Sequence, residues 1–447
     1  MTNDQAMAVP TLAPERPSGI RHRVLWLAVV AYMITYMDRV CIGHAAPAIR
    51  QEYGFDVVTM GWIFSAFNWS YALFQIPGGW LGDRFGPRRV LTIIVLWWSV
   101  FTAATALAWG KWSMAAFRFL FGLGEAGAFP TATRALSHWL PASERGFAQG
   151  ITHSGARLGA ALTPPVVVFL MTALGWRSVF YIFGVVGAVW AAAWYLFYRD
   201  RPEQHAGVNR AELALIHQQA VSEAAAPTPS GEGRRVPWKQ ILGSFNLWLI
   251  CVMYFCYAYS IWIYLTWFPT YLLEARHFTL REMSFWHMIA LGAATIGDSV
   301  GGWLSDHLAR RTGSLRLARR VVAMAGFVMA AACILPATLT EDRYVSVAFT
   351  TVALFSLELT VGVSWAVAMD VGPEYAGSVS GVMNMCGNLG GVLASIAVGY
   401  MVKFSGWPAP FLVAGGLCLL GAILFLRIDP NERILGQAAV PLETSAA

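Results

Sequence analysis

Charged residues are scarce in this 447-residue chain, because Asp, Glu, Lys and Arg make up only 13% of it. A soluble globular domain carries about 25% charged residues, so this chain has too little charge to cover a water-soluble body. Hydrophobic residues make up 57% of the sequence, and the mean hydropathy is +0.53. We therefore expect lipid to be the solvent for most of the protein.

Residue patterns typical of an enzyme or a metal site are also missing. The six cysteines all lie in apolar runs and form no Cys-x-x-Cys pair, which argues against a metal site or a disulfide framework. No pair of metal ligands and no Ser/His/Asp set is evident, so we expect neither enzymatic activity nor a cofactor. Residues 1–20 lack the apolar core of a cleavable signal peptide, so the first apolar run is expected to act as the insertion signal.

Twelve apolar runs are each about long enough to cross a bilayer as a helix. In lipid the backbone must satisfy its own hydrogen bonds, which makes helices the expected form. The sequence thus predicts an all-α membrane protein with two pseudo-symmetric halves of six transmembrane helices, residues 1–198 and 244–447. A polar, proline-containing linker at 199–243 would join them. The predicted runs are 24–46, 59–81, 88–108, 111–132, 147–170, 177–198, 245–268, 284–305, 319–338, 345–367, 378–402 and 408–427.

The basic residues lie in short clusters between these runs. Of the 31 Lys and Arg residues, 21 fall on the side of the N-terminus, the linker and the C-terminus, and seven fall on the other side. The other three, Arg39, Arg118 and Arg157, lie within runs. Under the positive-inside rule both termini and the linker are cytoplasmic. The net charge of +6 then reflects topology, and we expect no nucleic-acid partner.

One charged turn occurs twice. Gly79-Trp-Leu-Gly-Asp83-Arg84-Phe-Gly86-Pro-Arg88-Arg89 is matched by Gly302-Trp-Leu-Ser-Asp306-His-Leu-Ala-Arg310-Arg311, 223 positions later. An Asp near a helix end and arginines across a short turn can bind helix ends through charge–dipole contacts, although plain positive-inside anchoring is the simpler alternative. Twelve apolar runs, a central linker and this repeated turn resemble the major facilitator superfamily. The resemblance implies that the turns gate one side of the protein through Gly79, Asp83, Arg84, Arg88, Gly302 and Asp306.

Four charges lie inside predicted spans of the first half. Asp38 and Arg39 are adjacent in the first run, and Arg118 and Glu125 lie seven positions apart in the fourth, on one helix face. An ionisable residue at the bilayer centre costs at least about 2.5–3.5 kcal/mol, so such residues usually mark a transport pathway. The alternative is a purely structural network of salt bridges.

The motifs around these charges resemble a known family. Tyr36-Met-Asp38-Arg39, Tyr71-Ala-Leu-Phe-Gln75-Ile-Pro-Gly-Gly79 and Arg118-Phe-Leu-Phe-Gly122-Leu-Gly124-Glu125 are similar to the anion:cation symporter branch of the major facilitator superfamily. This resemblance covers nearly the whole chain. It implies that Asp38 and Glu125 carry protons and that Arg118 holds their charge network. It also implies that Arg39 binds a substrate carboxylate beside Tyr36 and Tyr71, although ordinary packing is an alternative for the tyrosines.

The second half offers fewer candidates. Asn384 and Asn388 lie four apart on one face of a glycine-rich run, and by the resemblance Asn384 is the better match to an asparagine that binds substrate hydroxyls. Ser364 and Trp365 are expected to line the same cavity, with helix–helix hydrogen bonding as the alternative. No partner can be assigned to Glu358.

Two further residues of the first and second halves have open roles. Arg157 follows His153 by one helical turn, and it either binds a second acidic group of the substrate, carboxylate or sulfonate, or pairs with an acid elsewhere. Asp298, one turn before Gly302, is expected to support the repeated turn.

The resemblance implies a monomeric secondary transporter that imports a small organic anion with protons by alternating access, in a bacterial inner membrane. A proton-driven exporter is the alternative within transport. The fifth run reads Gly155-Ala-Arg-Leu-Gly159-Ala-Ala-Leu-Thr-Pro164-Pro165, which does not match the Gly-Pro-x-x-Gly-Gly signature of such exporters. A non-transporting membrane sensor would need a longer cytoplasmic module than these polar segments provide.

Overall fold

The computed structural model describes residues 16–216, 237–372 and 375–434, except for the side chains at 76, 83, 142, 143 and 146. The described backbone is helical, and no strand occurs within it. Helices of the first half are α1 (Ile20–Tyr53), α2 (Val57–Phe85), α3 (Pro87–Thr105), α4 (Lys111–Glu125), α5 (Ala128–Trp139), α6 (Ala142–Leu174) and α7 (Trp176–Phe197). Short helices η1 (Pro202–Gln204) and α9 (Trp238–Gly243) lie in the linker. Helices of the second half are α10 (Phe245–Trp262), the π-helix η2 (Ile263–Trp267), α11 (Phe268–Glu274), α12 (Leu280–Thr312), α13 (Leu315–Leu339), α14 (Arg343–Val371), α15 (Ala376–Ser405) and α16 (Pro408–Arg427).

Each of the predicted apolar runs lies mostly on helical backbone, although 88–108 extends beyond α3 and 111–132 includes the turn between α4 and α5. Within the described residues, nine helical segments are long and apolar enough to cross a membrane, counting α10 to α11 as one. The predicted spans in α2, α12 and the α4–α5 pair are not among these nine. The protein is therefore an all-helical, multi-pass membrane protein.

Two predicted spans are interrupted for identifiable reasons. Between α4 and α5 the backbone comes so close to α2 that a Cβ on Gly78 would lie 2.6 Å from the Cα of Gly127. In the second half, Pro269 has no backbone N–H to bond to the carbonyl of Leu265, four residues earlier, and its ring would clash with that carbonyl in a regular α-helix. The helix therefore widens into the π-helix η2, which includes Leu265.

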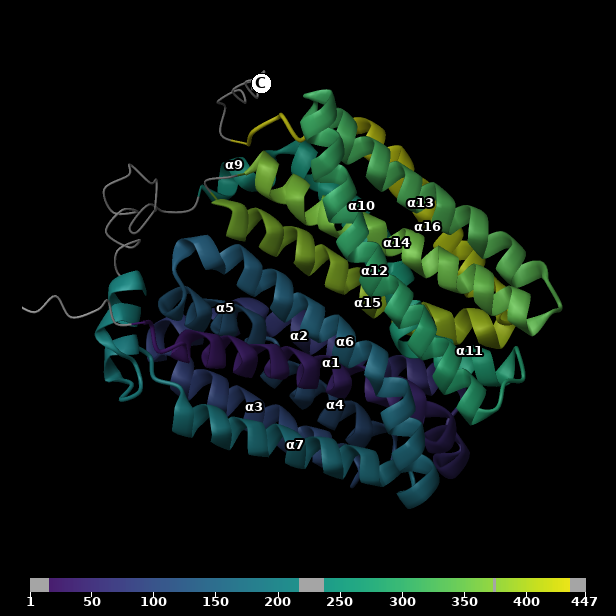
Figure 1. Cartoon of the computed structure of the whole chain (residues 1–447). Helices are drawn as coiled ribbons and strands as arrows, with labels where there is room; N and C mark the ends of the chain where they lie inside the picture. The colour runs from purple at the N-terminus through teal and green to yellow at the C-terminus, as the bar shows by residue number, and fades with distance from the viewer. Residues whose placement is uncertain (1–15, 217–236, 373–374, 435–447) are drawn as a thin grey trace, which may run out of the picture.

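The two halves lie side by side in Figure 1, with α1–α7 below and α10–α16 above. They spread apart toward the linker and meet at the opposite end, near α11. The main contacts between halves are α2 against α15 and α6 against α12. Glycine permits the first contact, because a Cβ on Gly61 would lie 2.5 Å from the Ser395 carbonyl oxygen.

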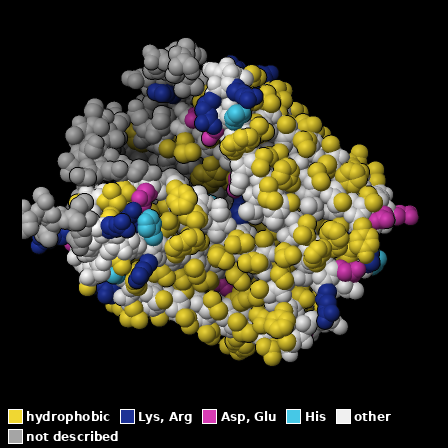
Figure 2. Space-filling model, viewed as in Figure 1, with side chains coloured by type: hydrophobic (Ala, Val, Ile, Leu, Met, Phe, Trp, Pro, Cys, Tyr) yellow, Lys and Arg dark blue, Asp and Glu magenta, His cyan; other side chains and the backbone are white. Residues whose placement is uncertain are grey.

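The surface agrees with a lipid environment. Large apolar side chains such as Ile93, Val100 and Leu196 are more than half exposed, and Figure 2 shows hydrophobic side chains across the flanks of both halves. The same view shows a hollow between the halves on the side of the linker. Helices thus present apolar flanks outward and leave access to the space between the halves from one end.

Candidate functional site

The centre of the first half contains a buried ion pair between α1 and α4. The Nε of Arg39 donates to Oε1 of Glu125 at 2.9 Å, and its Nη2 pairs with the same oxygen. Glu125 is fully buried and Arg39 nearly so. The other carboxylate oxygen, Oε2, has no hydrogen-bond partner among the described residues. One oxygen is thus held by arginine while the second can accept a proton.

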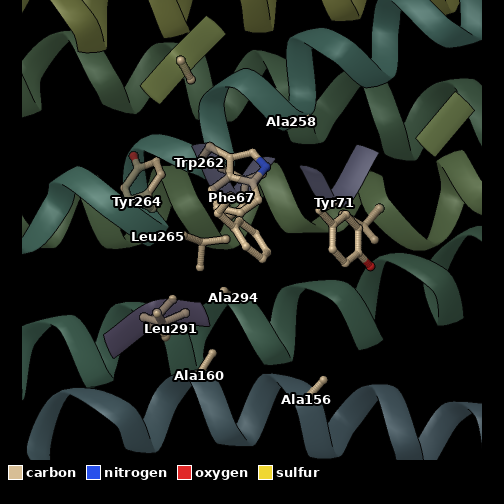
Figure 3. Close-up of a cluster of buried hydrophobic side chains, with 14 of the residues drawn as sticks. Phe67, Tyr71, Ala156, Ala160, Ala258, Trp262, Tyr264, Leu265, Leu291 and Ala294 are labelled. Carbon is tan, nitrogen blue, oxygen red and sulfur yellow. The ribbon is translucent and has the colours of Figure 1, made fainter. Parts of the chain in front are cut away.

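Aromatic rings surround the Arg39 guanidinium. Its Cζ lies 4.7 Å from the ring centre of Tyr36, 4.8 Å from that of Tyr71 and 5.3 Å from that of Phe67. Aromatic faces attract cations most strongly where water is excluded. Figure 3 shows Phe67 against Trp262 of the second half, with ring centres 5.9 Å apart, and Tyr71 to one side. The structure thus brings Tyr36, Arg39 and Tyr71 together at the boundary between the halves.

Asp38 and Arg118 lie next to this pair. Both are buried, and Asp38 is close enough to Arg118 and Glu125 to interact electrostatically with each. The Trp98 indole faces the Asp38 carboxylate without meeting hydrogen-bond geometry. The Cζ of Arg118 lies 4.2 Å from the ring centre of Phe121. Two acids and two arginines therefore form one group whose charges balance.

A second charged cluster joins the two halves at Arg157 of α6. Its Nη1 donates to Oε1 of Glu358 at 3.1 Å, and its Nη2 lies 2.9 Å from Oε2 of the same residue and 3.7 Å from Oδ2 of Asp298. The hydroxyl of Tyr257 on α10 also donates to Glu358, at 2.9 Å. Asp298 therefore lies close to Arg157. The sequence had suggested a different role, support of the repeated turn at Gly302.

The polar candidates of the second half differ in what their side chains contact. The Asn384 amide donates to Gln75 of α2 at 3.1 Å, and the Trp365 indole donates to the Tyr254 hydroxyl at 3.1 Å. Both Asn384 and Trp365 are only half-buried. Ser364 is fully buried, and its hydroxyl donates to the carbonyl of Thr360 at 2.7 Å. In this conformation Ser364 does not join the central group.

The repeated turns lie at the linker end of each half, where their charged residues contact their own half or the start of the linker. The Arg88 guanidinium donates to the Tyr195 carbonyl, and its backbone N–H donates to Asp200. Asp306 pairs with Arg319 at 2.8 Å, and Arg319 also pairs with Asp370.

The remaining gating candidates are Arg84, Gly79, Gly302 and Asp83. Arg84 lies over the rings of Trp80 and Phe85. Gly302 lies against Gly362, whereas Gly79 faces the side chain of Pro130. The side chain of Asp83 lies outside the described part of the structure.

Contacts at the opposite end join one half to the other. Arg50 of α1 pairs with Glu274 of α11, and Lys403 pairs with Asp56 at 3.3 Å. Deeper in the protein, Nε2 of His44 lies 2.9 Å from Nδ1 of His287, and both imidazoles are fully buried. The end away from the linker is therefore closed.

Comparison with known proteins identifies the family. The family model described as the Major Facilitator Superfamily matches residues 28–395 and 377–444. The chain belongs to this superfamily. Solved structures with a similar fold include a bacterial homologue of the human lysosomal transporter Spinster, in an inward-facing and occupied conformation. That chain has a TM-score of 0.76 and 17% identity, with 93% of this chain and 98% of that chain covered, which shows the shared fold.

Relatives with higher sequence identity are named as transporters. A probable sulfoacetate transporter of Cupriavidus necator is 41% identical over 414 residues, which cover 92% of this chain and 94% of the relative. A D-galactonate transporter of Escherichia coli is 30% identical over 440 residues, covering 96% of this chain and all of the relative. The names of family and relatives point to a transporter, not an enzyme. They also confirm the resemblance to sugar-acid and organic-anion transporters.

Sequence reasoning missed several residues of the candidate site. Tyr257 was not selected, because a single tyrosine in an apolar run gives little signal. Gln75 was noted only as part of the motif that begins at Tyr71, and no role was assigned to it. His44 and His287 did have a signal, since each is an ionisable residue inside a predicted span. The pairing of Arg157 with Glu358 was left open, because residues 201 positions apart show no spacing pattern.

Proposed function

We propose that the protein is a proton-coupled importer of small organic anions in a bacterial inner membrane, working by alternating access. The names of its relatives support an organic anion as substrate. The central ion pair supports proton coupling, and the basic clusters support cytoplasmic termini. We further propose the full twelve-helix arrangement, with halves 1–198 and 244–447, a cytoplasmic linker at 199–243 and a monomeric working unit.

The observation that carries this proposal is the buried pair of Arg39 and Glu125. A guanidinium binds carboxylates through a planar fork of N–H donors. A substrate carboxylate that takes the donors of Arg39 leaves Glu125 buried without its cation. An isolated buried carboxylate is strongly unfavourable as an anion, so Glu125 would take a proton at Oε2. Substrate and proton are then held together in the loaded state.

The neighbouring residues have complementary roles in this proposal. Arg118 keeps the remaining charges balanced, and Asp38 is a second proton carrier because its buried oxygens have no hydrogen-bond partner among the described residues. Tyr36 and Tyr71 position Arg39 and offer hydroxyls to the substrate. On the opposite face, Asn384, Ser364 and Trp365 are proposed to contact the rest of the substrate.

The described conformation supports an inward-facing state. The end away from the linker is closed by Arg50 with Glu274 and by Lys403 with Asp56, and the hollow in Figure 2 opens beside the linker. With the linker in the cytoplasm, this is the side from which substrate leaves. The solved structure of similar fold in an inward-facing conformation agrees with this assignment. The repeated turns, with Gly79, Asp83, Arg84, Arg88, Gly302 and Asp306, would close this side in the other state.

Glu125→Gln tests the coupling step, because glutamine resembles the protonated acid. In proteoliposomes with sulfoacetate, galactonate and glucarate as probes, the variant should still exchange substrate in counterflow. It should not accumulate substrate when an inward proton gradient is applied. Glu432→Gln, at an exposed glutamate near the end of the described chain, is the matched control and should behave as wild type.

Two results would contradict the proposal. Normal pH-driven accumulation by Glu125→Gln would remove Glu125 from the coupling mechanism. Failure of the wild type to transport any of these anions would overturn the substrate assignment. Reconstitution in both orientations, with the proton gradient reversed, separates import from export.

A further inference from the structure

Among the described residues, two arginine–carboxylate pairs join membrane-spanning helices in the middle of the protein, Arg39 with Glu125 and Arg157 with Glu358, and the function proposed above uses only the first. The first, Arg39 with Glu125, lies within one half. The second, Arg157 with Glu358, crosses from α6 to α14 and connects the halves. In both pairs the glutamate is fully buried. In both, an arginine that could bind an acidic group is occupied by a carboxylate of the protein.

Both arginines lie beside the same tyrosine. Tyr36 contacts the Arg39 guanidinium at 4.7 Å and is also within electrostatic reach of Arg157. Helix α6 comes close to α1 because Gly159 lies against the backbone of Met33, one turn before Tyr36. Figure 3 shows Ala156 and Ala160 of α6, which flank Arg157, facing the cluster that contains Phe67 and Tyr71. One substrate between the halves could therefore meet both guanidinium groups.

The charges around Arg157 determine what can bind there. Glu358 from α14 and Asp298 from α12 both face it, so the three groups together carry one negative charge when both acids are ionised. The other titratable neighbours in the described structure are Tyr257 and Tyr254 from α10, His153 from α6 and Tyr36 from α1. An incoming acidic group would meet this excess of negative charge unless one carboxylate took up a proton.

Glu358 is the carboxylate that would take the proton. Its side chain is fully buried, whereas that of Asp298 is 25% exposed and can remain hydrated as an anion. When an oxygen of the substrate takes the Nη donors of Arg157, Glu358 loses its cation and binds one proton. The exchange replaces one anion by another at Arg157 and adds one proton to the protein, so charge is conserved at the cluster.

We propose that Arg157 and Glu358 form a second subsite for an acidic group. The preferred substrate is then a small dianion with an acidic group at each end, one held by Arg39 and one by Arg157. The second group brings one proton of its own through Glu358. This inference rests on the proposed function, since it assumes that Arg39 binds the first group.

A binding subsite and a simple structural bridge between the halves can be told apart, because the effect of breaking the Arg157–Glu358 pair on transport depends on substrate charge only for a subsite. A bridge that only holds the halves together would affect every substrate alike when it is broken. A binding subsite affects dianions and leaves monoanions unchanged. Substrate charge is therefore the variable to change in the experiment.

Uptake into proteoliposomes should be measured with sulfoacetate and succinate as dianions and with galactonate and propionate as monoanions. Arg157→Gln should lower kcat/KM for the dianions by about tenfold or more, the effect of losing charge-assisted hydrogen bonds. Uptake of the monoanions should stay within about twofold. Arg177→Gln is the matched control, because Arg177 pairs with Glu52 within the first half at the closed end.

Glu358→Gln tests the proton assignment. With a dianion, this variant should move one proton fewer per substrate than wild type, measured at zero membrane potential from the pH gradient that just balances a fixed substrate gradient. With a monoanion its proton count should not change. The double variant Arg157→Gln/Glu358→Gln removes both charges of the pair and so leaves no single buried charge. It replaces Arg157→Gln if that variant fails to fold, and it should show the same preference for monoanions.

The outcomes separate the inference from the function on which it rests. If wild type transports none of the four anions, the proposed function fails. If wild type transports dianions and Arg157→Gln lowers all substrates equally, or none, only the second subsite is refuted. An unchanged proton count in Glu358→Gln with a dianion would refute the role of Glu358.

Discussion

Two glycines, Gly61 of α2 and Gly399 of α15, lie where these helices cross toward the closed end of the protein. A Cβ on Gly399 would lie 2.7 Å from the carbonyl oxygen of Val57 and 3.0 Å from the Cα of Val58. Both are backbone atoms, so no side-chain rotation can relieve the clash. Gly399→Ala should therefore push α15 away from α2 and destabilise the state in which this end is closed.

The size of the effect follows from the cost of overpacking, which is typically about 1–3 kcal/mol. The state in which this end is open lacks the contact and does not bear that cost. A free-energy difference of 1.4 kcal/mol changes an equilibrium tenfold, so Gly399→Ala should shift the balance toward the open state by about 5- to 150-fold. Inward-facing and outward-facing populations would both change measurably.

Cross-linking at the closed end provides the assay. Lys403 and Asp56 form an ion pair at 3.3 Å, so cysteines at both positions should be joined quickly by a short bifunctional reagent. Gly399→Ala should slow this reaction. Gly381→Ala, on the same helix, is the control, because a Cβ there meets nothing within 4 Å. Cross-linking of a folded Gly399→Ala variant at the parent rate would show that the crossing does not control closure.

Two further predictions follow from other contacts. Arg39→Lys keeps the charge but loses the planar fork, so it should lose most substrate binding in detergent; unaltered affinity would assign the carboxylate contact to another residue. Burial opposes ionisation of Glu212 in the linker, but hydrogen bonds from Ser18 and from the backbone N–H groups of Arg21 and Ile20 outweigh it and hold its pKa below the usual range. A lowered pKa stabilises the folded state above about pH 4.3 and ceases to do so as the pH falls through the folded-state value. Glu212→Gln should therefore lower the melting temperature at pH 7, and its difference from wild type should shrink in acid.

The helices and the first group of charges could be predicted because their signals are local. An apolar run of about 20 residues specifies a helix in lipid regardless of its neighbours. Arg118 and Glu125 lie two turns apart on one helix, so their shared face follows from helix geometry. Asp38 and Arg39 stand out as charges in an apolar run. The structure then adds which acid faces which arginine, and it pairs Arg39 with Glu125.

Contacts between the halves could not be predicted in the same way. Arg157 and Glu358 come together only through the packing of α6, α12 and α14. Ser364 illustrates the opposite problem. Its hydroxyl donates to the carbonyl four residues earlier, a bond that a serine makes readily within its own helix, so its residue type alone does not place it in a cavity.

The two arginine pairs differ in what their exchange would do to the protein. At Arg39 the displaced acid, Glu125, belongs to the same half, so substrate binding there changes charge without breaking a contact between halves. At Arg157 the displaced acid, Glu358, belongs to the other half, so binding there breaks an ion pair that crosses between them. A ligand shifts a conformational equilibrium only through its different affinity for the two states. Under the proposed mechanism, a dianion therefore acts on the arrangement of the halves directly, whereas a monoanion at Arg39 leaves the crossing pair intact.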